Sequence, residues 1–285
     1  MPRTVAVGLD GSYESLAAAE WAAREAVMYG IPLRVVYAGE QQPHDYVPFA
    51  GHPVPPPGVD RSARLLTETK ARLAHRHSGV RVSAEQIAGP PVPVLAAVAG
   101  EAELLVLGSR GLGMVAGVLL GSVALAVVAR AERPVVLVRA EEEGGQERRT
   151  EAFDGAGDTT PYRDVVLGLD LRAPDGRVLE FAFDAASRRA TGLRVVHGGE
   201  AAADDVEQRL ADVLGPWQDK YPGIEVTAEA VIGDAGTHLV DASRAASLVV
   251  VGRRGREGSL GPHIGPVAHA VLQHALAPVA VVAHD

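Results

Sequence analysis

The chain has 285 residues, of which 47% are apolar and 22% charged, a composition typical of a globular protein with room for two domains. A formal net charge of −9 argues against a nucleic-acid groove, and the absence of cysteine excludes disulfides, thiolate catalysis and zinc sites with sulfur ligands. Acidic residues interrupt the N-terminal segment, and no apolar run reaches the roughly 18 residues of a membrane span. We therefore expect a cytoplasmic protein that does not interact with membranes.

In the first half, short runs of Val, Leu and Ile alternate with longer amphipathic segments. Because the runs are apolar throughout, they are typical of parallel strands covered by helices on both faces. The pattern predicts strands at 4–9, 33–38, 80–87, 104–108 and 135–139, and helices at 12–29, 60–77, 91–99 and 121–131. We expect an α/β domain with a doubly wound, five-stranded parallel sheet, flavodoxin-like or related, that binds ligands at the carboxyl ends of its strands.

The second half repeats the first. VAVGLDGS (5–12) matches VVLGLDLR (165–172), LRVVYAGE (33–40) matches LRVVHGGE (193–200), and AELLVLGSRG (102–111) matches ASLVVVGRRG (246–255). Strands are therefore predicted at 164–169, 193–197, 224–231, 247–252 and 279–283, with helices at 175–191, 203–220, 234–245 and 265–276. The repeat indicates two tandem domains of the same fold.

Two stretches lack the apolar periodicity of the rest. The proline-rich segment 41–58 has no counterpart in the second half and is interpreted as a loop insertion. The charged, glycine-bearing segment 141–160 is interpreted as an interdomain linker. The predicted organisation is a first domain over 1–140, a linker over 141–160 and a second domain over 161–285.

A glycine-rich loop follows the fourth predicted strand. Gly108 and Gly111 are followed by Gly121 and Ser122, where the next helix is expected to begin. Glycine lets the backbone approach an anion, and the first N–H groups of a helix attract negative charge. With Arg110 nearby, the loop predicts a phosphate cradle, whereas the alternative is a plain strand-to-helix connection with Ser122 as N-cap. The same spacing at Gly252, Gly255 and Gly265 favours the cradle.

This G-x2-G-x9-G motif, followed by serine, resembles that of the universal stress protein family, and the resemblance covers both halves. It implies the fold of that family, which is adenine nucleotide alpha hydrolase-like, and ATP as ligand, with or without Mg²⁺. The residues that it implies for ATP contacts are Asp10 for the adenosine moiety, Ala38 for adenine, and Gly108, Arg110, Gly111, Gly121, Ser122 and Val123 for the phosphates. Asp10 also ends a predicted strand, where a carboxylate can accept hydrogen bonds from ribose or lie at the N-cap region of the next helix.

The second half departs from the motif in one place. Pro266 replaces Ser122, which removes a hydroxyl and a backbone donor, although proline suits the first turn of a helix. His197-Gly198 takes the place of Tyr37-Ala38, and a basic run contains Arg254. The expected second-half site residues are Asp170, Gly198, Gly252, Arg254, Gly255 and Gly265, with weaker nucleotide binding than in the first half.

Catalytic chemistry is not indicated by the sequence. No Gly-Lys-Ser/Thr follows either glycine loop, so the chain lacks a Walker A motif, and no catalytic or metal-binding set accompanies the loops. The predicted function is that of an ATP-binding protein with a regulatory role in the stress response, in which the nucleotide controls conformation or partners. A slow ATPase or phosphotransfer enzyme, or a nucleotide-free interaction module, remains the alternative.

The last predicted strand of each half is short and apolar. Val135–Val138 and Val279–Val282 have sheet edges that can pair with each other and satisfy their backbone groups. This predicts an intrachain pseudo-dimer of the two halves, with association into a homodimer as a further expectation.

Overall fold

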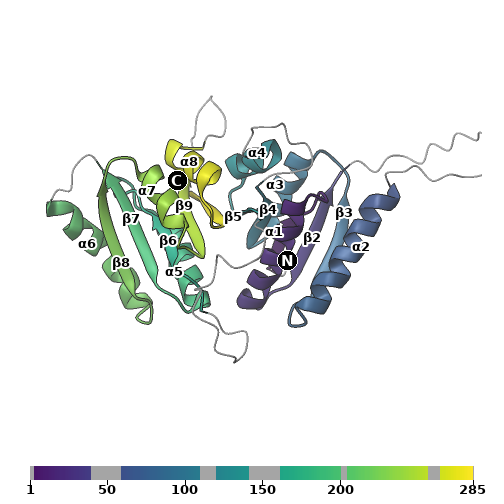
Figure 1. Ribbon diagram of the computed structural model, residues 1–285, viewed down its shortest axis with the longest axis horizontal. Helices are drawn as coiled ribbons and strands as arrows, with labels where there is room; N and C mark the ends of the chain where they lie inside the picture. The colour runs from purple at the N-terminus through teal and green to yellow at the C-terminus, as the bar shows by residue number, and fades with distance from the viewer. Residues whose placement is uncertain are drawn as a thin grey trace, which may run out of the picture.

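The structure is a computed structural model that describes residues 3–39, 59–109, 120–140, 161–199, 204–255 and 264–284 (Figure 1). The first half contains β1 (Val5–Gly8), α1 (Tyr13–Tyr29), β2 (Leu33–Ala38), α2 (Val59–Arg76), β3 (Val82–Ile87), α3 (Pro91–Glu101), β4 (Leu104–Gly108), α4 (Ser122–Arg130) and β5 (Val135–Val138). The second half contains β6 (Val165–Gly168), α5 (Gly176–Arg189), β7 (Leu193–Gly199), α6 (Asp204–Lys220), β8 (Val226–Ile232), α7 (Ala235–Ser243), β9 (Leu248–Arg254), α8 (Pro266–His274) and β10 (Val279–His284). The predicted elements are confirmed, while the insertion at 41–58 and the linker at 141–160 lie outside the described residues.

The described strands form one ten-stranded sheet in the order β3-β2-β1-β4-β5-β10-β9-β6-β7-β8. Within each half the strands are parallel, and the order 3-2-1-4-5 is that of a Rossmann-type half rather than of flavodoxin, so of the two predicted possibilities the structure has the related doubly wound type. Hydrophobic periodicity identifies strands but does not determine which strand lies beside which. The order reverses between β1 and β4, and between β6 and β9, which places a crevice at the carboxyl ends of those strands.

The two halves join through β5 and β10, the one antiparallel pair among the described strands. Val135 lies opposite Val281, Val136 opposite Ala280, and Leu137 opposite Val279. This pairing satisfies backbone groups that would otherwise form two open sheet edges. The predicted pairing of the two final strands is therefore confirmed.

Helices cover both faces of the continuous sheet (Figure 1). Helices α1, α2, α5 and α6 pack on one face, and α3, α4, α7 and α8 pack on the other. Alternate residues of the junction strands enter the two cores: Val136 and Ala280 join the first, and Val135 and Val281 the second. Each core thus runs through both halves without a break. In the described part of the chain, no helix has the length and apolar character that a membrane crossing needs.

Charged and aromatic side chains also join α1 to α5 across the junction. Arg189 donates from Nη2 to Glu25 Oε1, and the two side chains are only 1% and 4% exposed. The Arg188 guanidinium carbon lies 3.9 Å from the centre of the Tyr29 ring. Burial raises the pKa of Tyr29 to about 12, an effect that the Arg188 charge opposes. Tyr29 therefore stays neutral, and the junction contains a buried ion pair that the apolar pattern did not predict.

Candidate functional site

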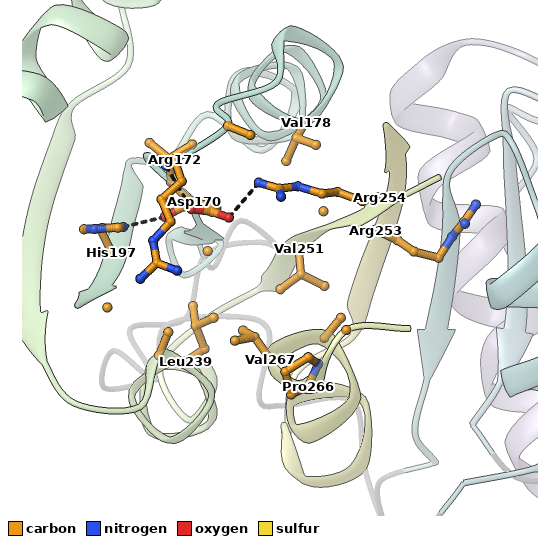
Figure 2. A pocket seen from close by; sticks show the side chains of 18 of the residues that line it. Asp170, Arg172, Val178, His197, Leu239, Val251, Arg253, Arg254, Pro266 and Val267 are labelled. Atoms are coloured by element: carbon orange, nitrogen blue, oxygen red, sulfur yellow. Dashed lines mark hydrogen bonds and ion pairs between the residues drawn. The ribbon is translucent and has the colours of Figure 1, made fainter. Parts of the chain in front are cut away.

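A cavity of about 690 Å³ opens at the carboxyl ends of the strands in the second half (Figure 2). This volume lies in the usual range for small-molecule sites. Its wall includes every residue that the sequence named for the second half: Asp170, Gly198, Gly252, Arg254, Gly255 and Gly265. The glycine loop, the acidic residue and the end of β7, which are far apart in the sequence, therefore share one cavity.

Asp170 follows β6 and lies in the cavity wall. Its Oδ1 accepts the Arg172 backbone N–H at 2.9 Å, which holds the carboxylate at the start of the connection to α5. Its Oδ2 accepts a hydrogen bond from Arg254 Nη2 at 2.9 Å, as Figure 2 shows. Both side chains are about half exposed, so the ion pair is screened by water and contributes little to stability. A ligand can therefore exchange with either partner at low cost.

The cavity glycines serve different purposes. A Cβ on Gly252 would lie 2.7 Å from His284 Nε2, and a Cβ on Gly198 would lie 2.8 Å from the Cα of Ala235. These two glycines are needed for packing within the protein. A Cβ on Gly265 would meet no atom of the described residues within 4 Å. Gly265 is therefore not required for packing against a described neighbour, and its missing side chain leaves space open in the cavity.

Helix α8 points its N-terminal end at the cavity. Gly265 is its N-cap, no side chain caps it, and Pro266 occupies the first turn. Val267 and Ala268, which follow, also line the cavity. The first N–H groups of a helix have no acceptor within the helix, and they carry partial positive charge. This end of the cavity is suited to an anion.

In the first half, Asp10 lies in the tight connection from β1 to α1. Its Oδ1 accepts hydrogen bonds from the Ser12 N–H at 2.9 Å and from Ser12 Oγ at 2.6 Å, while Ser12 Oγ accepts the Ser15 N–H and caps α1. Asp10 thus orients the N-cap residue without being the cap. Gly108 ends the neighbouring strand β4, and a Cβ there would lie 2.8 Å from the carbonyl carbon of Glu14. Asp10 and Gly108 therefore share one edge of the sheet, beside Ala38 at the end of β2.

The first-half loop closes at the start of α4. Gly121 donates from its N–H to the Ser109 carbonyl at 2.8 Å and is the N-cap, so Ser122 begins the helix and is not its cap. Val123 follows and is 36% exposed. Arg110 and Gly111 lie outside the described residues, so their predicted roles remain predictions.

Comparison with known proteins identifies the family. The model of the Universal stress protein family matches residues 1–139 and 161–283. The chain belongs to the universal stress protein family. Universal stress protein Rv2005c of Mycobacterium tuberculosis is 34% identical over 297 residues, which cover 97% of this chain and 96% of that protein.

A solved universal stress protein shares the fold. The crystal structure of a universal stress protein from Archaeoglobus fulgidus covers 99% of this chain and 98% of its own, with a TM-score of 0.72 and 18% identity. A universal stress protein crystallised in complex with cAMP is 30% identical and covers 49% of this chain and 98% of its own, with a TM-score of 0.38. The family match over both halves, together with the Archaeoglobus fulgidus structure, confirms the predicted family and the two tandem α/β domains.

The two halves of this universal stress protein differ around their crevices. Four residues, 9–12, connect β1 to α1, whereas seven residues, 169–175, connect β6 to α5. The longer connection brings Arg172 to the second cavity, and two histidines, His197 and His284, line it as well. His197 Nδ1 lies 2.9 Å from the Leu169 carbonyl oxygen. Arg172 and His284 were not among the predicted site residues. Alignment of the repeats places Ser12 and Ala140 at their positions, and this difference between the halves is the signal that marks them.

Proposed function

We propose that this universal stress protein binds ATP and that the bound nucleotide has a regulatory role in the stress response. The observation that carries the proposal is the second-half cavity, where a carboxylate and the uncapped N-terminal end of a helix line one space of nucleotide size. A carboxylate at a strand end can accept hydrogen bonds from ribose hydroxyls, and a helix N-terminus attracts phosphate. The repeated glycine loop extends the proposal to the first half.

Equivalent positions of the two halves make the same proposed contacts. In the first half, Asp10 faces the adenosine, the backbone at Ala38 faces adenine, and the loop from Gly108 to Val123 surrounds the phosphates. In the second half, Asp170 and Gly198 take the first two roles, and Gly252, Arg254, Gly255 and Gly265 take the third. Arg254 pairs with Asp170 in the described structure, so the proposal requires it to turn toward the phosphates when a nucleotide enters.

The direct test is identification of the bound nucleotide. We expect mass spectrometry of purified protein after denaturation to release an adenine nucleotide, and calorimetry of nucleotide-free protein to show binding of ATP in preference to GTP. ADP and AMP, measured in parallel, would report how much each phosphate contributes. A folded protein that releases no nucleotide and gives no binding heat with ATP contradicts the proposal.

We further expect the first half to bind ATP more tightly than the second. Pro266 lacks the hydroxyl and the N–H that Ser122 offers at the same turn, and each charge-assisted hydrogen bond lost costs roughly 1.5–3 kcal/mol. The loss corresponds to an affinity about tenfold lower or more. Arg254 and its neighbours offset part of this loss, so weaker rather than absent binding is expected.

Reciprocal substitutions measure this difference by calorimetry. Ser122→Pro should weaken the tighter site, and Pro266→Ser should strengthen the weaker one, since proline at this position already fits the α8 backbone. Two wild-type sites of equal affinity would refute the asymmetry.

A further inference from the structure

Two arginines reach across the junction to the helices of the opposite half. Arg253, in β9 of the second half, donates from Nη2 to the carbonyl of Ala131, the C-cap residue that follows α4 of the first half. Arg139, which follows β5 of the first half, donates from Nη2 to the carbonyls of Gln273 and Leu272 in the last turn of α8. The contacts are reciprocal, because each half holds the C-terminal end of a helix of the other.

The backbone of each arginine lies beside the glycine loop of its own half. Arg253 lies between Gly252 and Arg254 in the cavity wall, and Figure 2 shows its side chain turned away from the cavity toward the first half. Arg139 follows Val138, whose carbonyl accepts the Ser109 N–H at 2.8 Å next to the first-half loop. Each side chain therefore connects one candidate phosphate site to the opposite half.

The chemistry of these contacts suits the ends of helices. The last carbonyls of a helix have no donor within the helix and carry partial negative charge, so a guanidinium stabilises them. Arg253 is 7% exposed; burial lowers its pKa and the nearby Glu132 charge raises it, but an arginine keeps its proton in such surroundings. A buried charge in this place constrains the position of the α4 end.

The repeat does not explain these contacts. Alignment of the halves places Ser109 at the position of Arg253, and Ala283 at the position of Arg139. Each arginine is thus present in one half alone, and they come from different positions of the repeat. They nevertheless make the same kind of contact on equivalent helices, which indicates a shared role at the junction.

We propose that Arg253 and Arg139 are crossed positioning residues for nucleotide binding: each holds, from one half, the helix whose N-terminal end faces the phosphates in the other half. The inference rests on the proposed function. Helices α4 and α8 have only nine residues each, so a shift at the C-terminal end moves the N-terminal end as well. Arg253 therefore affects the first-half site, and Arg139 the second-half site.

The test isolates one site at a time in the full-length protein. Gly265→Val blocks the second half, and Arg253→Met is then added and compared with Gly265→Val alone by calorimetry with ATP and with adenosine. We expect ATP affinity to fall about fivefold while adenosine affinity stays unchanged, because adenosine has no phosphate for α4 to hold. In the reciprocal experiment, Gly121→Val blocks the first half and Arg139→Met is added. Calorimetry then measures the affinity of the second half for ATP and for adenosine.

Arg163→Met is the matched control. Arg163 donates to the Arg244 carbonyl at the end of α7, a contact of the same kind within one half, on a helix that the proposal does not place at a phosphate. In the Gly265→Val background we expect it to change neither the ATP nor the adenosine affinity of the first-half site. Arg253→Lys is measured beside Arg253→Met, so that a folding defect in the methionine variant leaves the test intact. Lysine has a shorter side chain than arginine. We expect Arg253→Lys to lose less affinity than Arg253→Met, again for ATP only.

The outcomes separate the two proposals. Unchanged ATP affinity in the folded arginine variants, or an equal loss for ATP and adenosine, overturns the positioning role. Failure of the wild-type protein to bind ATP overturns the proposed function instead.

Discussion

Gly121→Val is expected to reduce ATP binding in the first half below detection, and Gly265→Val to do the same in the second. Both glycines are helix N-caps with extended backbone, φ −69° and ψ 137° at Gly121 and φ −63° and ψ 160° at Gly265, which valine adopts without strain. The fold should therefore tolerate the change. The branched side chain then occupies the space through which a phosphate approaches the first N–H groups of the helix.

Calorimetry of the two single variants and of the double variant checks this prediction. Each single variant should retain one ATP site, and the double variant none. Gly100→Val is the control, since Gly100 lies near the C-terminal end of α3 and a Cβ there would meet no described atom within 4 Å. ATP affinity that survives unchanged in folded Gly121→Val would remove the loop from the proposed site.

Arg189→Met is expected to lower the free energy of unfolding by about 3–5 kcal/mol. The substitution leaves the Glu25 carboxylate buried at the α1–α5 contact without its guanidinium partner. Removal of one member of a buried ion pair costs more than removal of both, because the remaining charge loses its compensation without regaining water. The loss should therefore be largest for the single variant.

Urea denaturation followed by circular dichroism measures this effect. The double variant Glu25→Leu with Arg189→Met should recover most of the lost stability. Arg194→Met serves as control, because Arg194 pairs with Glu229 at 2.8 Å but both side chains are more than a third exposed, and its loss should cost less than about 1 kcal/mol. If Arg189→Met costs no more than Arg194→Met, the buried pair does not stabilise the junction.

Much of the fold was predictable because it depends on local pattern. Apolar runs identified the strands, the internal repeat predicted two domains of one type, and the apolar final strands predicted the β5–β10 pairing that the structure confirms. For the candidate site, the glycine spacing and the strand-end acidic residues selected residues that line one cavity in the second half. Their assignment to ATP remains a prediction.

The sequence by itself determined the elements, the tandem repeat and the family, since periodicity records which backbone segments are buried and motif spacing shows which glycine-rich loop recurs in both halves. The tertiary structure alone decided the strand order, the Glu25–Arg189 pair and the reach of Arg139 and Arg253 across the junction. These contacts join residues more than a hundred positions apart in the sequence. Their partners depend on how two helix-covered sheets meet at one antiparallel strand pair, and no local pattern contains that geometry.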